Sequence, residues 1–133
     1  DLQNVRGQAL IQFHKGSVLF LKEDYKKANE ELVKACMVFN DIGDLPNYAE
    51  SLILQAKIVK NLDELDTAEN LLDKALDVSK KINSIGFIND ASIEKNLIHN
   101  HMNFLLQLFH QIVINRNLRE SHLPDVFVHN CLA

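Results

Sequence analysis

The stretch that decides the fold contains one pattern twice: YKKANEELVKACMVF at residues 25–39 and LDTAENLLDKALDVS at residues 65–79. The first copy begins at residue 25 and the second at residue 65, which gives a period of 40 residues. A spacing of three and four residues between apolar positions places each copy on one face of an α-helix. Large and small residues alternate along that face: Tyr25, Ala28, Leu32, Ala35 and Phe39, then Leu65, Ala68, Leu72, Ala75 and Ser79.

A polar break and a further helical stretch precede each copy. The breaks are residues 22–24 and 61–64, and the stretches before them carry apolar residues at helical spacing. Two copies of helix, turn and helix at a fixed period are typical of a stacked helical repeat. Gly16 predicts a close helix crossing in the first stretch, because a glycine at mid-helix is costly on an exposed surface. We therefore predict an all-α fold of antiparallel helix hairpins.

The predicted helices cover residues 1–21, 25–40, 47–60, 65–82 and about 89–115. Asp90 is the expected N-cap of the fifth helix. Ile85-Gly86 resembles Ile42-Gly43, which lies in the loop before residue 47. Because the second pair comes 43 residues after the first instead of 40, it predicts a loop with three added residues.

The predicted domain covers residues 1–115. Clear repeats are expected at about 8–40 and 47–82, followed by a degenerate or capping helix at 89–115. A unit that closes a stack is expected to be atypical, because one of its faces meets water. Residues 116–133 form either a short helix, a packed tail or a disordered tail.

Composition and charge exclude several classes of function. The 133 residues are 47% hydrophobic and 24% charged, ordinary values for one globular domain. The formal net charge is −4 and the charges are interspersed, so no basic face predicts nucleic-acid binding. No apolar run reaches the roughly 20 residues of a membrane span. Cys36 and Cys131 have no metal-like spacing, which favours a reducing compartment, and we predict a cytoplasmic location. Because the chain begins with Asp1, we expect it to be part of a longer protein.

Motifs for catalysis and metal binding are missing from the sequence. It contains no GxSxG, HExxH, Gly-rich phosphate loop or CxxC. His99 and His110 would lie about 16 Å apart on a helix and cannot share one ion. His122, His129 and Cys131 are close in sequence but lack a fourth ligand. We expect no enzymatic activity, no cofactor and no metal site.

The repeated pattern resembles the tetratricopeptide repeat, which has a small residue in its first helix and a large–Ala–large–Ala face in its second. The matching positions are Gly16, Leu19, Tyr25, Ala28, Leu32 and Ala35, then Ala56, Val59, Leu65, Ala68, Leu72 and Ala75. The 40-residue period is similar to the longer-repeat branch, which includes kinesin light chains, LGN-type polarity adaptors and Rap/PlcR-type peptide-sensing regulators. Asn40 stands where the common repeat has a proline. The match covers about residues 8–82.

This resemblance implies a right-handed superhelix whose first helices line a concave groove for a peptide or a partner's helix. The groove positions that it implies are Phe13, His14, Ser17, Phe20 and Leu21, then Glu50, Ile53, Leu54, Lys57, Lys60 and Asn61. The apolar members would anchor the ligand, and the polar members would set its orientation and charge. Asn61 is the residue that could hold a peptide backbone, while His14 has either a structural or a ligand role. Binding of a chaperone's C-terminal carboxylate is disfavoured, because Phe13 and Ser17 replace the Lys and Asn that it needs.

The last predicted helix has an unusually apolar face between Phe104 and Val113. It is either buried as the final helix of the stack, or exposed and packed on a neighbouring domain or a second copy. Leu105, Phe109 and Ile112 would form the assembly face. We predict a non-catalytic protein- or peptide-binding module, with a peptide-sensing regulator as one subtype. The alternative is a structural segment that assembles through its last helix, for example as a homodimer.

Overall fold

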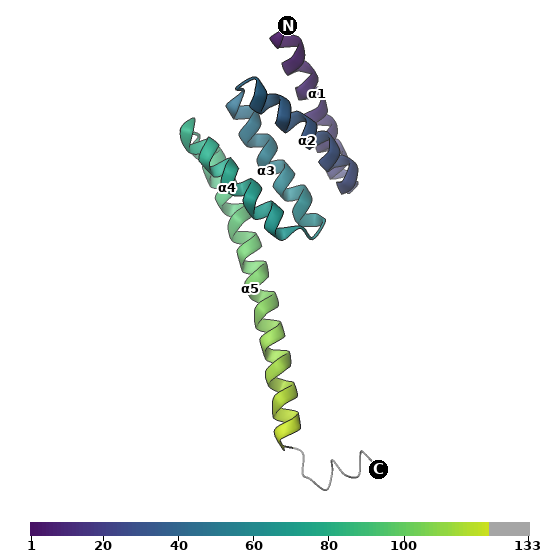
Figure 1. The fold of residues 1–133 in the computed structure, drawn as a ribbon, viewed down its shortest axis with the longest axis vertical. Coiled ribbons are helices and arrows are strands. Elements are labelled where there is room, and N and C mark those ends of the chain that lie inside the picture. The colour runs from purple at the N-terminus through teal and green to yellow at the C-terminus, as the bar shows by residue number, and fades with distance from the viewer. Residues whose placement is uncertain (123–133) are drawn as a thin grey trace. The chain divides into compact units, whose positions relative to one another are not determined.

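The computed structural model describes residues 1–122, which form five α-helices and no strand (Figure 1). The helices are α1 (Leu2–Leu21), α2 (Tyr25–Asp41), α3 (Leu45–Asn61), α4 (Leu65–Lys81) and α5 (Ile85–His122). The all-α fold class predicted from the sequence is confirmed for this part of the chain. The bounds of α1 to α4 agree with the predicted ones to within two residues.

The turns that join these helices share one geometry. Each has three residues, and its middle residue has a left-handed backbone, with φ of 62° at Glu23, 72° at Gly43, 63° at Asp63 and 54° at Asn83. In the first turn, the Asp24 N–H donates to the Leu19 carbonyl at 2.9 Å and the Glu23 N–H donates to the Phe20 carbonyl at 3.0 Å. This pair of bonds is a Schellman motif, and it recurs in the other three turns. Successive helices are therefore joined by turns of the same length and backbone geometry.

The predicted loop at Ile85-Gly86 is wrong. Helices α2 to α5 begin at residues 25, 45, 65 and 85, so the 20-residue spacing of helix starts is unbroken. Gly86 lies in the first turn of α5, where backbone N–H groups lack intrahelical partners and a glycine does little harm. The left-handed position belongs instead to Asn83, because asparagine tolerates that conformation. Ile85 therefore corresponds to Leu45 and not to Ile42.

Helices α1 to α4 pack consecutively (Figure 1). Helix α1 also contacts α3. One core cluster is formed by Ala9, Ala35 and Phe39, and another by Ala28, Leu32 and Ile58. The close helix crossing predicted at Gly16 is confirmed. A Cβ atom on Gly16 would lie 1.9 Å from Leu32 Cδ2 and 3.3 Å from the Ala28 carbonyl oxygen. Only glycine allows α1 and α2 to approach this closely.

Helix α5 is longer than predicted at both ends. It begins before Asp90, and Ser84 provides the cap instead, because its Oγ accepts the Phe87 N–H at 3.4 Å. The next turn of the 20-residue spacing would fall at residues 102–104, but the helix continues through them. Asn103 suits the left-handed position, whereas Phe104 has no side-chain acceptor with which to cap a following helix. At the equivalent positions, Asp24, Asp44 and Ser84 cap the starts of α2, α3 and α5, whereas Glu64 makes no side-chain cap bond at the start of α4. The cap that three of these four helices use is thus not possible at position 104.

The chain divides into two compact units, and the boundary falls within α5, between Asp1–Ile98 and His99–Ala133. Of the predicted tail at 116–133, residues 116–122 belong to α5, and residues 123–133 lie outside the described residues. No helix within residues 1–122 has both the length and the apolar character needed to cross a membrane.

Candidate functional site

A hollow of about 290 Å³ lies between α1, α3 and α5, entirely within the first unit. Its lining is Phe13 and Ser17 of α1, Glu50, Ile53, Leu54 and Lys57 of α3, and Phe87 and Asp90 of α5. Four of these side chains are apolar and form its hydrophobic part. Two carboxylates, a lysine and a hydroxyl supply the polar part.

The 40-residue period explains why these side chains meet. Ile53 stands 40 residues after Phe13, Lys57 after Ser17, and Asp90 after Glu50. Helices α1 and α3 end 40 residues apart, at Leu21 and Asn61, and helices α3 and α5 begin 40 residues apart, at Leu45 and Ile85. Equivalent positions on these alternate helices therefore face the same side of the unit. The hollow is therefore a product of the repeat itself.

The charges of the hollow are unequally compensated. Lys60 Nζ lies 2.9 Å from Glu94 Oε2, and Lys57 Nζ lies 3.9 Å from Glu94 Oε1. Both lysines are thus directed to one mostly buried carboxylate on α5. Glu50 and Asp90 are exposed, and within the described residues no cationic group lies within 4.0 Å of either. The hollow therefore has two carboxylates without an ion-pair partner, and because two lysines share the one carboxylate of Glu94, these five groups together carry a formal net charge of −1.

Six of the eleven predicted groove residues line this hollow: Phe13, Ser17, Glu50, Ile53, Leu54 and Lys57. The other five lie outside its lining, and of these Leu21 is exposed. His14 is exposed, with its ring centroid 5.5 Å from that of Phe13. Phe20 packs against the core cluster of Ala28, Leu32 and Ile58. Lys60 is paired with Glu94, and the Asn61 Nδ2 donates to the Lys57 carbonyl at 2.8 Å.

Sequence reasoning missed Phe87 and Asp90. Asp90 could have been found by continuing the period, because it follows the predicted groove residue Glu50 by 40 residues, whereas Phe87 follows Asn47, which was not a predicted groove position. The predicted loop at Ile85-Gly86 shifted the register and hid this relation. The structure therefore adds a third helix to a site that the sequence built from two.

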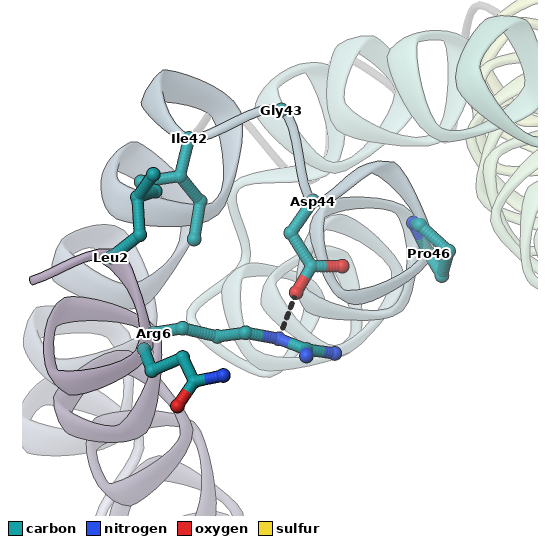
Figure 2. Close-up of a pocket in the computed structure, with 7 residues that line it drawn as sticks. Leu2, Arg6, Ile42, Gly43, Asp44 and Pro46 are labelled. Atoms are coloured by element: carbon teal, nitrogen blue, oxygen red, sulfur yellow. Dashed lines mark hydrogen bonds and ion pairs between the residues drawn. The ribbon is translucent and has the colours of Figure 1, made fainter.

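A second hollow, of about 370 Å³, lies where α1 meets the turn between α2 and α3. Figure 2 shows the Arg6 side chain reaching across to Asp44, and Arg6 Nε lies 2.7 Å from Asp44 Oδ2. The Asn47 Nδ2 also donates to Asp44 at 2.7 Å. Burial alone would raise the pKa of Asp44, but the hydrogen bonds from Asn47 and Arg6 outweigh it and hold that pKa below its ordinary value. Arg6 and Asp44 thus pair with each other, and the described residues that line this hollow include no other charged side chain.

The reactive groups of the first unit do not gather at either hollow. Cys36 is buried, and its thiol donates to Gln55 Oε1 at 3.4 Å. Burial raises the pKa of Cys36 to about 12, which keeps the thiol protonated and unreactive. Within residues 1–122, no group of three or more His, Cys, Asp or Glu side chains could hold a metal ion. His129 and Cys131 lie outside the described residues.

The predicted assembly face is exposed. Leu105 is 46% exposed, Phe109 67% and Ile112 64%. Phe104, Leu106, Leu108 and Val113 are exposed beside them. We call these seven residues the apolar strip of α5. Of the two interpretations left open by the sequence, exposure agrees with a strip that packs on another body.

Comparisons with known proteins do not extend this picture. No family model matches the chain, and no match was found among curated proteins or among solved structures. The resemblance to the tetratricopeptide repeat thus stays a prediction, and function is argued from the hollow alone.

Proposed function

We propose that this chain is a non-catalytic binding module that holds a protein or peptide segment in the hollow between α1, α3 and α5. The observation that carries this proposal is the pairing of an apolar floor with two uncompensated carboxylates at equivalent repeat positions. Such a surface suits a segment that presents an apolar side chain beside a basic one. We further propose that the helices stack in the tetratricopeptide manner, with α1, α3 and α5 as the groove-lining helices.

The apolar part of the hollow supports the choice of ligand. Phe13 and Phe87 are half-buried and come from α1 and α5, while Leu54 lies between them on α3. A volume of about 290 Å³ is too small for a folded domain and suits one or two side chains. Affinity would then come from burial of an apolar anchor, at roughly 25 cal/mol per Å².

The charges support a preference for basic ligands. Lys57 and Lys60 are directed to Glu94, so neither is fully available to an acidic ligand. Glu50 and Asp90 are the available charges, and a Lys, an Arg or an N-terminal amine could approach either one. Binding at exposed charges should weaken as salt rises.

A displayed library of random peptides, selected against the full chain, tests this proposal. We expect enriched peptides to combine an apolar residue with a neighbouring Lys or Arg. Their affinity is then measured by fluorescence anisotropy. Phe87→Ala should weaken binding by about 10-fold or more, because it removes an apolar wall. Glu50→Gln with Asp90→Asn should weaken binding several-fold and flatten its salt dependence.

Matched controls separate the hollow from the rest of the surface. Ile11→Ala removes an exposed apolar side chain of α1 that is not part of the hollow, and Glu30→Gln removes an exposed carboxylate of α2. Both should leave affinity unchanged. If the hollow variants bind the selected peptides as well as the controls do, the hollow is not the binding site. If no peptide is enriched, the proposed function itself fails.

A further inference from the structure

The second unit carries a feature that the hollow does not use. The seven residues of the apolar strip are between 37% and 67% exposed. Together they leave on the order of 600 Å² of apolar surface open, at the upper limit of the patches found on monomeric proteins. A surface of this kind marks an interface.

The chemistry of the strip favours a neutral apolar partner. From Asn96 to Asn115 the sequence contains no Asp, Glu, Lys or Arg. No formal charge on this segment would have to lose its hydration when the strip is covered, and no like charges would repel an identical surface. A second copy of the same strip meets both conditions. Two copies face to face would bury on the order of 1,000 Å², the lower end of specific interfaces.

The spacing of the large residues fits an antiparallel pair. Met102, Leu105, Phe109 and Ile112 are separated by three, four and three positions, and we call these four residues the seam. The order of these spacings is the same in both chain directions, as an antiparallel pair requires. Centred on residue 107, an antiparallel pair places Leu105 against Phe109 of the second copy and Met102 against Ile112 of the second copy. Large side chains then meet smaller ones along the seam.

A parallel pair would be less favourable because of Arg116. This residue follows Ile112 by four positions and continues the same seam. Parallel alignment would place the two Arg116 side chains together, each compensated only by its exposed ion pair with Glu120 at 3.2 Å. Antiparallel alignment separates them by about 27 Å along the axis, at 1.5 Å per residue. We propose that the chain forms a symmetric antiparallel dimer through the apolar strip of α5.

Sedimentation velocity and light scattering of the full chain over a concentration series test this proposal. The monomer has a mass of 15.2 kDa, and we expect a species of twice that mass that grows with concentration. Phe109→Glu places a charge in the seam and should raise the dissociation constant by about 100-fold or more. Gln107→Glu adds the same charge on the opposite face of α5, and it should leave the dissociation constant unchanged.

Three results would overturn the proposal. One is a wild-type chain that stays monomeric at every concentration. Another is a Phe109→Glu variant that stays a dimer. The last is a monomeric wild type whose melting temperature falls when Phe109 is changed to Glu, because the strip would then be covered within its own chain. Circular dichroism of each variant shows whether the helices remain formed.

Spin labels test the orientation. A single label at Asn117→Cys, in a chain that also carries Cys131→Ser, reports the distance between the two copies, while Cys36 is buried. An antiparallel pair should give about 30 Å, from ten residues on either side of the centre at 1.5 Å each. A distance near 10 Å, the spacing of two packed helices side by side, would mean a parallel pair and would overturn the proposed geometry.

Discussion

The first unit and the part of α5 after Ile98 are both helical, but only the first unit buries its helices. In residues 2–98, small residues stand where helices cross: Gly16, Ala28, Ala35, Ala56, Ala68 and Ala75 are all buried. The positions that continue this pattern by 40 residues are Asn96, at the end of the first unit, and Leu108 and Asn115 beyond it, and all three are exposed. Helix formation therefore does not distinguish the two regions, whereas close packing does.

The comparison shows what a helical repeat requires beyond a helical pattern. A returning helix must be able to approach, and a leucine or asparagine at the crossing point keeps it at a distance. A helix with large apolar residues but no small ones at the crossing points keeps an apolar surface without packing closely against a neighbouring helix. The following predictions test this difference, beginning with the largest expected effect.

Truncation of a large residue should be costly in the first unit and harmless beyond it. Leu72 is fully buried in α4, and Leu72→Ala should lower the free energy of unfolding by about 3 kcal/mol through lost burial and a cavity. Leu118, outside the apolar strip, is 48% exposed, and Leu118→Ala should change the free energy of unfolding by less than about 0.5 kcal/mol. Urea denaturation followed by circular dichroism measures both. Equal losses would show that the second region is packed like the first.

The two glycines of α1 should respond in opposite directions to the same substitution. Gly16→Ala drives a methyl group into the fully buried Leu32 and to 3.3 Å from the backbone oxygen of Ala28, so it should cost about 2 kcal/mol. Gly7 has nothing within 4 Å of an added Cβ atom. Gly7→Ala should instead stabilise by up to about 1 kcal/mol, the usual gain in a helix. Thermal melts of the two variants measure both changes in stability. A stabilising effect at both sites would contradict the close crossing of α1 and α2 at Gly16.

The left-handed turn positions predict a second pair of opposite effects, about 1 kcal/mol each. Gly43→Ala should destabilise, because a side chain is strained at φ of 72° even in open space. Asp63→Gly should stabilise, because it relieves the same strain at φ of 63°. Denaturant midpoints measure the two shifts. Effects of the same sign at both positions would contradict the equivalence of the turns.

The smallest effect is expected at the ion pairs. Asp44→Asn keeps an N-cap acceptor but loses the attraction to Arg6, and it should cost at most about 1 kcal/mol at neutral pH. The pKa of Asp44 is lower in the folded chain than in the unfolded one. Its contribution is therefore complete above the unfolded pKa of about 3.9 and is lost as pH falls through the folded value. The difference between wild type and Asp44→Asn should shrink accordingly in acid.

A matched pair in the second unit sharpens this test. Arg116 Nε lies 3.2 Å from Glu120 Oε1, and both side chains are largely exposed. Glu120→Gln should not change stability measurably, because solvent screens such pairs. A double variant of Arg6→Gln with Asp44→Asn should cost no more than either single change if the two residues act through each other.

Most of the fold could be predicted from local patterns in the sequence. The alternation at Tyr25 to Phe39 and its copy at Leu65 were enough to place α1 to α4, because spacing and polar breaks are local signals. The start of α5 was missed because Gly86 resembles a turn residue. Asn83, which has the left-handed conformation in the structure, was not recognised as a turn residue from the sequence. Its continuation past residue 104 coincides with the lack of a side-chain capping acceptor there, and such a lack is harder to recognise than a cap that is present.

The candidate site was predicted only in part, for a different reason. Phe13, Ser17 and Glu50 were placed by repeat position, and that information is in the sequence. The pairing of Lys60 with Glu94 joins residues 34 positions apart, and no local pattern indicates it. The uncompensated charge of the hollow therefore emerged only from the structure.

The constant 20-residue spacing of the turns means that this chain can gain or lose a hairpin without any insertion or deletion. The next turn of the spacing would fall at residues 102–104, and Asn103 already suits the left-handed position of that turn. With Asp at position 104 and small residues at 96, 108 and 115, the same number of residues would encode a returning helix instead of a straight one. Two topologies are thus separated by a few side chains. In such an array, point substitutions alone would be enough to change the number of hairpins.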